Sequence, residues 1–200
     1  MKWGGIKMRI ILGSKSPRRK ELLSLITKDF EIIVSNADEN VDASLVPEEK
    51  VKAIAKQKAE DVFNDLSTDE DIVVIGCDTI VVLDNEIYGK PKDREDATRM
   101  LKNFSNRTHE VMSGLCIIYR KDGKVTEKIA CDTALVHVKQ LSDEEITKWL
   151  DTGNAWDKAG AYAIQQEFAV HIDKINGNYD TVMGLPVPMV YDFLKEEEII

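Results

Sequence analysis

Near the N-terminus a short apolar run is followed almost at once by the start of a helix, and this order constrains the fold more than any other feature. Ile10-Ile11-Leu12 predicts a buried strand. Pro17 is typical of a first helical turn, with Ser16 as the N-cap before it. Apolar residues at helical spacing continue the helix: Leu22, Leu25 and Ile26. A strand, a small-residue turn and a helix start in this order aim free backbone N–H groups at one point, the geometry that binds an anion.

The first turn of this predicted helix is basic, with Arg18, Arg19 and Lys20 in succession. The helix dipole disfavours positive charge at that end. The cations are therefore consistent with a polyanion that binds among them. The residues alone leave one alternative open, an ordinary surface helix whose basic side chains point into water.

The composition is that of a globular chain large enough for a core in one domain: 200 residues, 43% hydrophobic and 32% charged. The net charge of −9 argues against a general nucleic-acid binder. The apolar stretches are too short for a membrane span, and the first residues lack the apolar core of a secretory signal, so we expect a cytoplasmic protein with no membrane partner. Cys77, Cys116 and Cys131 are odd in number and widely spaced, which disfavours a disulfide framework or a zinc site.

The centre of the chain, residues 72–83, is a nearly continuous apolar run. Such a run indicates a strand buried on both faces. Asp78 interrupts it, and a buried carboxylate needs a metal, a cation or a catalytic role to offset its desolvation. An aspartate in a turn at the end of the strand is the alternative. Gly76 permits a bulge or the close approach of a ligand.

Further charged residues have both ordinary and functional interpretations. Lys58 falls on the apolar stripe of a helix that begins at Pro47, where it either extends to solvent along its stem or binds a phosphate. Glu39 lies in an acidic loop, which on composition alone is more typical of a solvated turn than of a metal site. Lys90 taken by itself is an ordinary loop lysine.

The second half of the chain alternates helices and strands. Lys121–Lys124 predicts a hairpin turn, and Ser142–Glu145 is a capping box that opens a helix. Residues 168–175 predict a strand, followed by a hairpin turn at Asn176-Gly177. Val187–Leu194 predicts a C-terminal amphipathic helix. This mixture predicts a single α/β domain.

Several segments together resemble the motifs of the Maf family of nucleotide pyrophosphatases, a family also linked to septum formation. In chain order they are Ser14–Leu23, Lys58-Ala59, Gly76–Thr79, Gly89–Pro91, Asp157–Gln165 and Tyr179–Pro186. The resemblance runs from Met8 to about Leu194. It implies an elongated mixed sheet flanked by helices, with a nucleotide cleft between two lobes, related to the inosine-triphosphatase-like architecture. We expect one domain over residues 8–195, an N-terminal extension over residues 1–7, and a homodimer by family analogy.

The resemblance also implies catalytic roles. Asp78 matches the family's catalytic proton acceptor, and Glu39 stands where the family has an active-site carboxylate. Together they would hold Mg²⁺ or another divalent cation such as Mn²⁺, because these ions suit carboxylate and phosphate oxygens. Hydrogen bonds to the substrate would come from Ser14 and Ser16. The cations that would neutralise its phosphates are Arg18, Arg19, Lys58 and Lys90.

Base selection is implied by Arg18, Thr79 and Gln165, which match the branch that acts on dTTP and UTP. The expected reaction is hydrolysis of these nucleotides, and of modified pyrimidine triphosphates, to the monophosphate and pyrophosphate. Ala163 and Gln166 stand where the family has glycines, so this loop departs from the family pattern beside Gln165. The alternatives are the sister branch, which cleaves 7-methyl-GTP, and a non-catalytic nucleotide-binding protein that regulates division.

Overall fold

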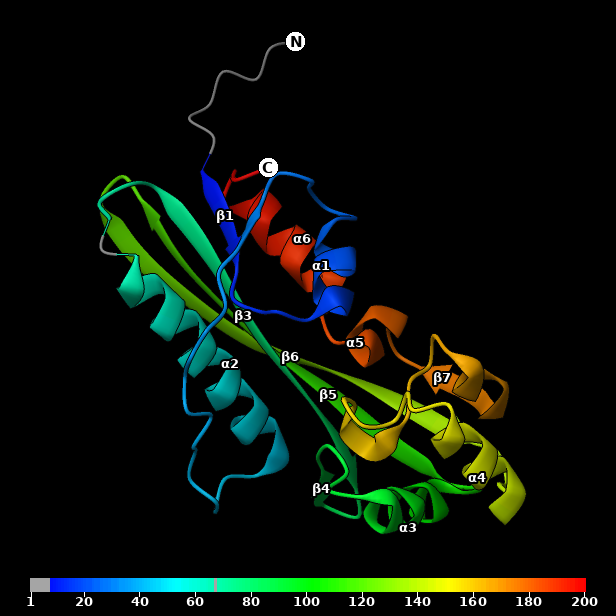
Figure 1. Ribbon diagram of the computed structural model, residues 1–200. Coiled ribbons are helices and arrows are strands. Elements are labelled where there is room, and N and C mark those ends of the chain that lie inside the picture. Colours follow the sequence, from blue (N-terminus) through cyan, green and yellow to red (C-terminus); the bar gives the residue numbers. More distant parts are fainter. Residues whose placement is uncertain (1–7, 67) are drawn as a thin grey trace.

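A computed structural model describes residues 8–66 and 68–200 (Figure 1). The predicted extension, residues 1–7, lies outside the described residues. One seven-stranded sheet forms the centre of the molecule, in the order β2-β1-β3-β5-β6-β7, with β4 paired to β3. Its strands are β1 (Arg9–Leu12), β2 (Glu31–Ile32), β3 (Ile72–Leu83), β4 (Glu86–Tyr88), β5 (Thr108–Lys121), β6 (Lys124–Val138) and β7 (Ile172–Asn176).

The sheet is mixed. β1 pairs in parallel with β2 and β3, whereas the other neighbouring strands are antiparallel. The predicted turn at Lys121–Lys124 joins β5 to β6, with Lys121 opposite Lys124. β3 and β5 are long strands with mostly buried side chains, as the apolar run at residues 72–83 predicts. The predicted class, an elongated mixed sheet flanked by helices, is confirmed.

Helices cover both faces of the sheet (Figure 1). One face carries α2 (Pro47–Asp65), which packs along β3 and β5. The opposite face carries helices at each end and short helices between them. These are α1 (Pro17–Leu23) and α6 (Val187–Glu196) at one end, α3 (Arg94–Phe104) and α4 (Asp143–Asp151) at the other, and η1 (Ala159–Ala161), η2 (Glu167–His171) and α5 (Tyr179–Met183) between. No helix among the described residues is long and apolar enough to cross a membrane.

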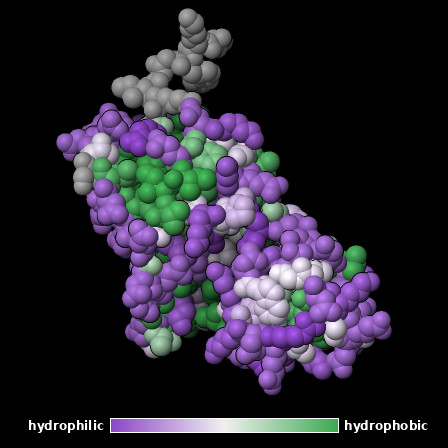
Figure 2. Space-filling view, in the orientation of Figure 1, coloured by the Kyte–Doolittle hydropathy of each residue, from purple (hydrophilic) through white to green (hydrophobic). Residues whose placement is uncertain are grey.

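The core on this second face is divided. One cluster packs α1 and α6 against β1 and the first half of β3. The other packs α3, α4 and η2 against the far ends of β3, β5 and β6. In the space-filling view most of the visible face is hydrophilic, with a broad apolar patch in the upper part of the view, and the face is hollowed between the α2 side and the α3–α4 side (Figure 2). The divided core is the structural counterpart of the predicted lobes.

One predicted strand is partly wrong. Of residues 168–175, the first part belongs to the short helix η2, and the strand begins only at Ile172. The predicted hairpin at Asn176-Gly177 is also wrong, because the chain continues into helix α5 rather than into a second strand. A Cβ on Gly177 would lie 2.8 Å from the Cα of Ala134. The glycine therefore serves a close crossing over β6 rather than a hairpin.

Candidate active site

One edge of β3 is left open along part of its length. β1 pairs with β3 only as far as Ile75, and β4 pairs with it only from Val81 onward. Gly76 to Ile80 therefore have no strand partner on that side among the described residues, whereas β5 pairs with the other side throughout. Asp78 and Thr79 lie in this gap.

A cavity of about 760 Å³ opens at this gap. Its walls come from the β1–α1 turn, the loop before α2, α2 itself, the middle of β3, the loop after β4, the segment around η1, and the end of α5. Every site residue predicted from the sequence lines it: Ser14, Ser16, Arg18, Arg19, Glu39, Lys58, Asp78, Thr79, Lys90 and Gln165. The cavity thus brings together segments that are far apart in the sequence.

The side chains of Asp78 and Thr79 leave opposite faces of β3, because successive residues of a strand alternate in direction. Asp78 faces α2, where it meets Lys58. Thr79 faces the other side, where it meets Arg19 and Ser113. The cavity therefore continues around the open edge of the strand and offers one set of groups on each side.

On the α2 side, one ammonium lies between carboxylates. Lys58 Nζ is 2.7 Å from Asp78 Oδ1 and 3.1 Å from Glu39 Oε1. The side chains of Lys58 and Asp78 are only 12% and 15% exposed, whereas that of Glu39 is 55% exposed. Lys58 therefore forms an ion pair at the cavity wall instead of extending to bulk solvent. Its predicted role as a phosphate ligand stays a prediction.

Asp78 is positioned to accept a proton. Lys58 contacts only its Oδ1, and Oδ2 has no hydrogen-bond partner among the described residues. A carboxylate that is fixed through one oxygen and open through the other can bind and deprotonate a water molecule.

Asp78 and Glu39 suit a divalent cation whose remaining coordination positions would be filled by the substrate and water. Asp78 and Glu39 converge on the same ammonium, so both point into one part of the cavity. No cluster of three or more His, Cys, Asp or Glu side chains suited to a metal occurs in the described part of the chain. Mg²⁺ is commonly held by one or two carboxylates together with substrate phosphates and water, and this sparse set matches that pattern.

On the opposite side of β3, Arg19 is held by several acceptors. Its Nε donates to the carbonyl oxygen of Gly184 at 2.8 Å. Nη1 and Nη2 each donate at 3.3 Å, to Ser14 Oγ and Thr79 Oγ1 respectively. These contacts fix the guanidinium plane across the cavity wall. A planar guanidinium in a fixed orientation can present its remaining N–H groups to a phosphate.

The β1–α1 turn has the predicted order of strand, turn and helix. Ser16 is the N-cap residue, although its side chain makes no capping hydrogen bond, and Pro17 opens α1. Ser14 is buried, and its Oγ accepts from the backbone N–H of Ser16 at 3.2 Å as well as from Arg19. The serine hydroxyl therefore ties the turn to the guanidinium.

Asp157 and Lys158 are charged residues of the cavity wall that the sequence prediction did not include among the site residues. Arg18 Nη1 lies 3.5 Å from Asp157 Oδ2, and Lys158 Nζ lies 2.6 Å from Asp157 Oδ1. Burial raises the pKa of Asp157, but Lys158 and Arg18 outweigh it and hold the pKa below its ordinary value. In the sequence, these two residues form a charged pair beside a run of small residues. Taken alone, that pattern predicts only a loop.

The remaining wall is partly aromatic. Tyr162 lines the cavity, and its hydroxyl lies 2.7 Å from Nε2 of buried His109. Burial lowers the pKa of His109 to about 3, so the imidazole is neutral at ordinary pH. His109 is not among the described residues that line the cavity, and its hydrogen bond supports Tyr162 from behind.

The residues that replace family glycines fit the backbone without strain. Neither Ala163 nor Gln166 has a positive φ, so glycine is not required at either position. Ala163 is buried in the cavity wall, and Gln165 beside it is exposed at the rim. Gln165 therefore keeps its access to a ligand.

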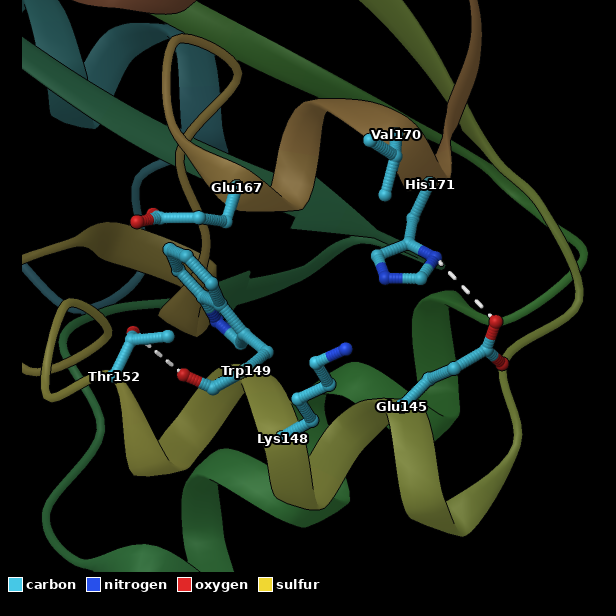
Figure 3. A pocket seen from close by; sticks show the side chains of 7 residues that line it. All are labelled: Glu145, Lys148, Trp149, Thr152, Glu167, Val170 and His171. Carbon is cyan, nitrogen blue, oxygen red and sulfur yellow. Dashed lines mark hydrogen bonds and ion pairs between the residues drawn. The ribbon is translucent and has the colours of Figure 1, made fainter.

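A second, smaller cavity of about 390 Å³ lies between α4 and η2 (Figure 3). Its walls include Glu145, Lys148 and His171, and His171 Nδ1 is 3.9 Å from Glu145 Oε1. None of the predicted site residues lines it. The larger cavity is therefore the candidate active site.

Known proteins resemble this chain over nearly its whole length. The model of the Maf-like protein family matches residues 9–197. A dTTP/UTP pyrophosphatase of Thermoanaerobacter sp. (strain X514) is 45% identical over 190 residues, which cover 95% of this chain and 97% of that protein. A dTTP/UTP pyrophosphatase of Bacillus velezensis is 44% identical over 191 residues, which cover 96% of this chain and 97% of that protein.

Among solved structures, the Staphylococcus aureus Ham1 protein aligns with a TM-score of 0.48 and 14% identity over 94% of this chain and 99% of that chain. The family model and the curated relatives each extend over nearly the whole chain. The chain therefore belongs to the Maf family.

Proposed function

We propose that this protein hydrolyses dTTP and UTP to the monophosphate and pyrophosphate. The observation that carries the proposal is the convergence of Asp78, Lys58 and Glu39 at one end of a cavity that Arg18 and Arg19 also line. Curated relatives matched over nearly their full length are dTTP/UTP pyrophosphatases, which supports the same substrates.

In the proposed reaction, Asp78 takes a proton from a water molecule through its free Oδ2. The water oxygen bonds to the α-phosphorus, the bond from that phosphorus to the bridging oxygen breaks, and pyrophosphate leaves. Lys58 orients the Asp78 carboxylate by its contact at 2.7 Å. The acidic loop brings Glu39 to the other side of the same ammonium.

Charge on the triphosphate is neutralised from several directions. Arg18 and Arg19 approach from the start of α1, and Lys90 from the loop after β4. Fixed cations of this kind stabilise the charge that develops on phosphoryl oxygens and on the leaving group. A divalent cation, Mg²⁺ or Mn²⁺, would be held by Asp78 and Glu39 with phosphate oxygens, and it supplies further charge neutralisation.

The pyrimidine base is assigned to the side of β3 that carries Thr79, with Gln165 at the rim. A glutamine amide both donates and accepts hydrogen bonds, which suits the imide edge of uracil or thymine. Modified pyrimidine triphosphates that keep this edge are included in the proposal.

The deciding experiment is pyrophosphate release with Mg²⁺ across a panel of nucleoside triphosphates, for wild type and Asp78→Asn. We expect preferential cleavage of dTTP and UTP, and a loss of about a hundredfold or more in kcat in the variant, because the general base is removed. Asp173→Asn, which alters an exposed carboxylate on β7 outside the cavity, is the matched control and keeps wild-type turnover.

Other outcomes would contradict the proposal in distinct ways. Near wild-type turnover of Asp78→Asn would overturn the assignment of the base. Preferential cleavage of 7-methyl-GTP would place the protein in the sister branch. The absence of release from any nucleotide by folded protein would favour the binding protein that regulates division. A cytoplasmic homodimer that binds neither nucleic acid nor membrane stays a prediction, and light scattering of the purified protein would test the dimer.

A further inference from the structure

Two successive hydrogen bonds lead from the Thr79 hydroxyl to buried groups behind the cavity wall. Thr79 Oγ1 lies 2.9 Å from Ser113 Oγ on the neighbouring strand β5, and Ser113 is fully buried. Ser113 Oγ in turn donates to the carbonyl oxygen of Thr181 in α5 at 2.8 Å. Ser113 lies outside the cavity wall and was not among the predicted site residues. Within the described part of the chain, Ser113 therefore acts on a ligand through Thr79.

The direction of each proton in these two hydrogen bonds follows from counting donors and acceptors. A serine hydroxyl has a single proton. Ser113 gives that proton to the Thr181 carbonyl, so it accepts in its contact with Thr79. The proton of that contact then comes from Thr79.

The other acceptor that the Thr79 hydroxyl could reach is the carbonyl oxygen of Gly184, but that oxygen is already occupied. That oxygen lies 3.5 Å from Thr79 Oγ1, longer than the contact with Ser113. It already accepts from Arg19 Nε at 2.8 Å and from Cys77 Sγ at 3.1 Å, which occupy both of its lone pairs. Burial raises the pKa of the Cys77 thiol, so the thiol keeps the proton that it donates.

Arg19 reinforces the same orientation. Its Nη2 donates to Thr79 Oγ1 at 3.3 Å, and a guanidinium cannot accept a hydrogen bond. The Thr79 hydroxyl thus donates its proton to Ser113 and accepts from Arg19 with one lone pair. Its second lone pair is available to the cavity, so the hydroxyl can only accept a hydrogen bond from a ligand.

We propose that Ser113 is a positioning residue that makes Thr79 an obligate acceptor, and that this acceptor selects a base with an N–H donor against one with a lone pair there. The inference rests on the proposed function and deepens it. Uracil and thymine carry an imide N–H, whereas cytosine has an unprotonated ring nitrogen at the same position. An acceptor facing that nitrogen leaves both lone pairs without a donor.

The kinetic test compares kcat/KM for UTP and CTP in wild type, Ser113→Ala and Thr181→Val. In Ser113→Ala the Thr79 hydroxyl is free to turn and donate, so we expect the preference for UTP over CTP to fall about tenfold, which is the worth of one net hydrogen bond. Thr181→Val is the matched control. It removes a fully buried hydroxyl that bonds Asp132, but it keeps the backbone carbonyl that Ser113 uses, so the preference is retained.

An unchanged UTP preference in Ser113→Ala, or an equal fall in Thr181→Val, would overturn the proposal. If wild type hydrolyses neither nucleotide, the same variants are compared by calorimetric binding of the α,β-methylene analogues of UTP and CTP, so that loss of the proposed function is distinguished from loss of the inference.

Neutron diffraction from deuterium-exchanged wild-type crystals tests the proton direction without any variant. Density for the Thr79 deuteron between Oγ1 and Ser113 Oγ is the expected result. Density directed toward the Gly184 carbonyl or into the cavity would overturn the proposal, whatever the variants show.

Discussion

Lys58 shows what a single residue contributes at this site. Its side chain lies on the apolar stripe of α2, where a cation is costly, and it is stabilised there by Asp78 and Glu39. Removing one partner of such a group leaves uncompensated charge. The lysine therefore keeps the carboxylates close to each other and to an anionic substrate.

We predict that Lys58→Met lowers kcat/KM for UTP about a hundredfold, because the cation that orients Asp78 and holds Glu39 near it is lost. Lys56→Met is the control, since Lys56 lies on the same helix but pairs with Glu127 and Glu60 outside the cavity. Steady-state kinetics on both variants checks the prediction. A Lys58→Met enzyme within threefold of wild type would show that the ion pair has no role in turnover.

The pairing of these residues could not have been predicted from the sequence. The sequence points to Asp78 because it interrupts an apolar strand, and to Lys58 because it lies on an apolar stripe. Their contact depends on how α2 is placed along β3, and the local pattern of neither element contains that register. The resemblance to the Maf family indicates these residues as site residues. Their contact with each other is visible only in the packing of α2 on β3.

At the scale of elements, the packing of α2 on β3 depends on a glycine. A Cβ on Gly76 would lie 2.4 Å from the Ala55 carbonyl oxygen and 2.7 Å from the backbone nitrogen of Ala59. The close approach that the sequence suggested at Gly76 is therefore made by helix α2, with its backbone against the strand, and a ligand is not needed to explain it. This contact brings Lys58 within reach of Asp78.

We predict that Gly76→Ala destabilises the fold by about 2 kcal/mol, because α2 must move away from β3 to admit the methyl group. Gly89→Ala is the control for stability, since a Cβ there meets nothing within 4 Å. Urea unfolding of both variants gives the comparison. Equal unfolding free energies would mean that the helix accommodates the methyl group without cost.

Local patterns predicted most elements, and they failed where tertiary contacts decide. The capping box at Ser142 is present with both of its hydrogen bonds, and the turn before Lys124 joins the expected strands. Residues 168–171, in contrast, have a strand-like composition but form η2. Phe168 is fully buried there against Trp149 and Tyr162. This aromatic packing, which involves distant residues, overrides the local β preference.

At the scale of the whole molecule, stability carries a pH dependence from a buried histidine. His109 is 2% exposed, and its pKa is lowered from the ordinary value of 6.5 to about 3, first by burial and then by His137. The unfolded chain binds a proton below pH 6.5 that the folded chain does not. The free energy of unfolding therefore decreases as the pH falls from 6.5 toward 3. Above pH 6.5, His109 adds no pH dependence to it.

We predict that His109 accounts for a loss of about 2 kcal/mol in the free energy of unfolding between pH 8 and pH 5. His109→Phe keeps an aromatic ring against Phe104. Its free energy of unfolding should fall by about 2 kcal/mol less than that of wild type between pH 8 and pH 5. His171→Gln, which replaces a histidine of η2, is the control variant. Urea unfolding at both pH values checks the prediction, and identical losses in wild type and His109→Phe would contradict it.

The open edge of β3 has a mechanical consequence. β3 and β5 run unbroken beneath both core clusters, and β6 is paired to β5 along its length, whereas β1 and β4 stop short on either side of the gap. The two lobes are thus connected by continuous strands. A change in the width of the cavity between them would bend and twist these strands, and it would require no strand to separate from its neighbour.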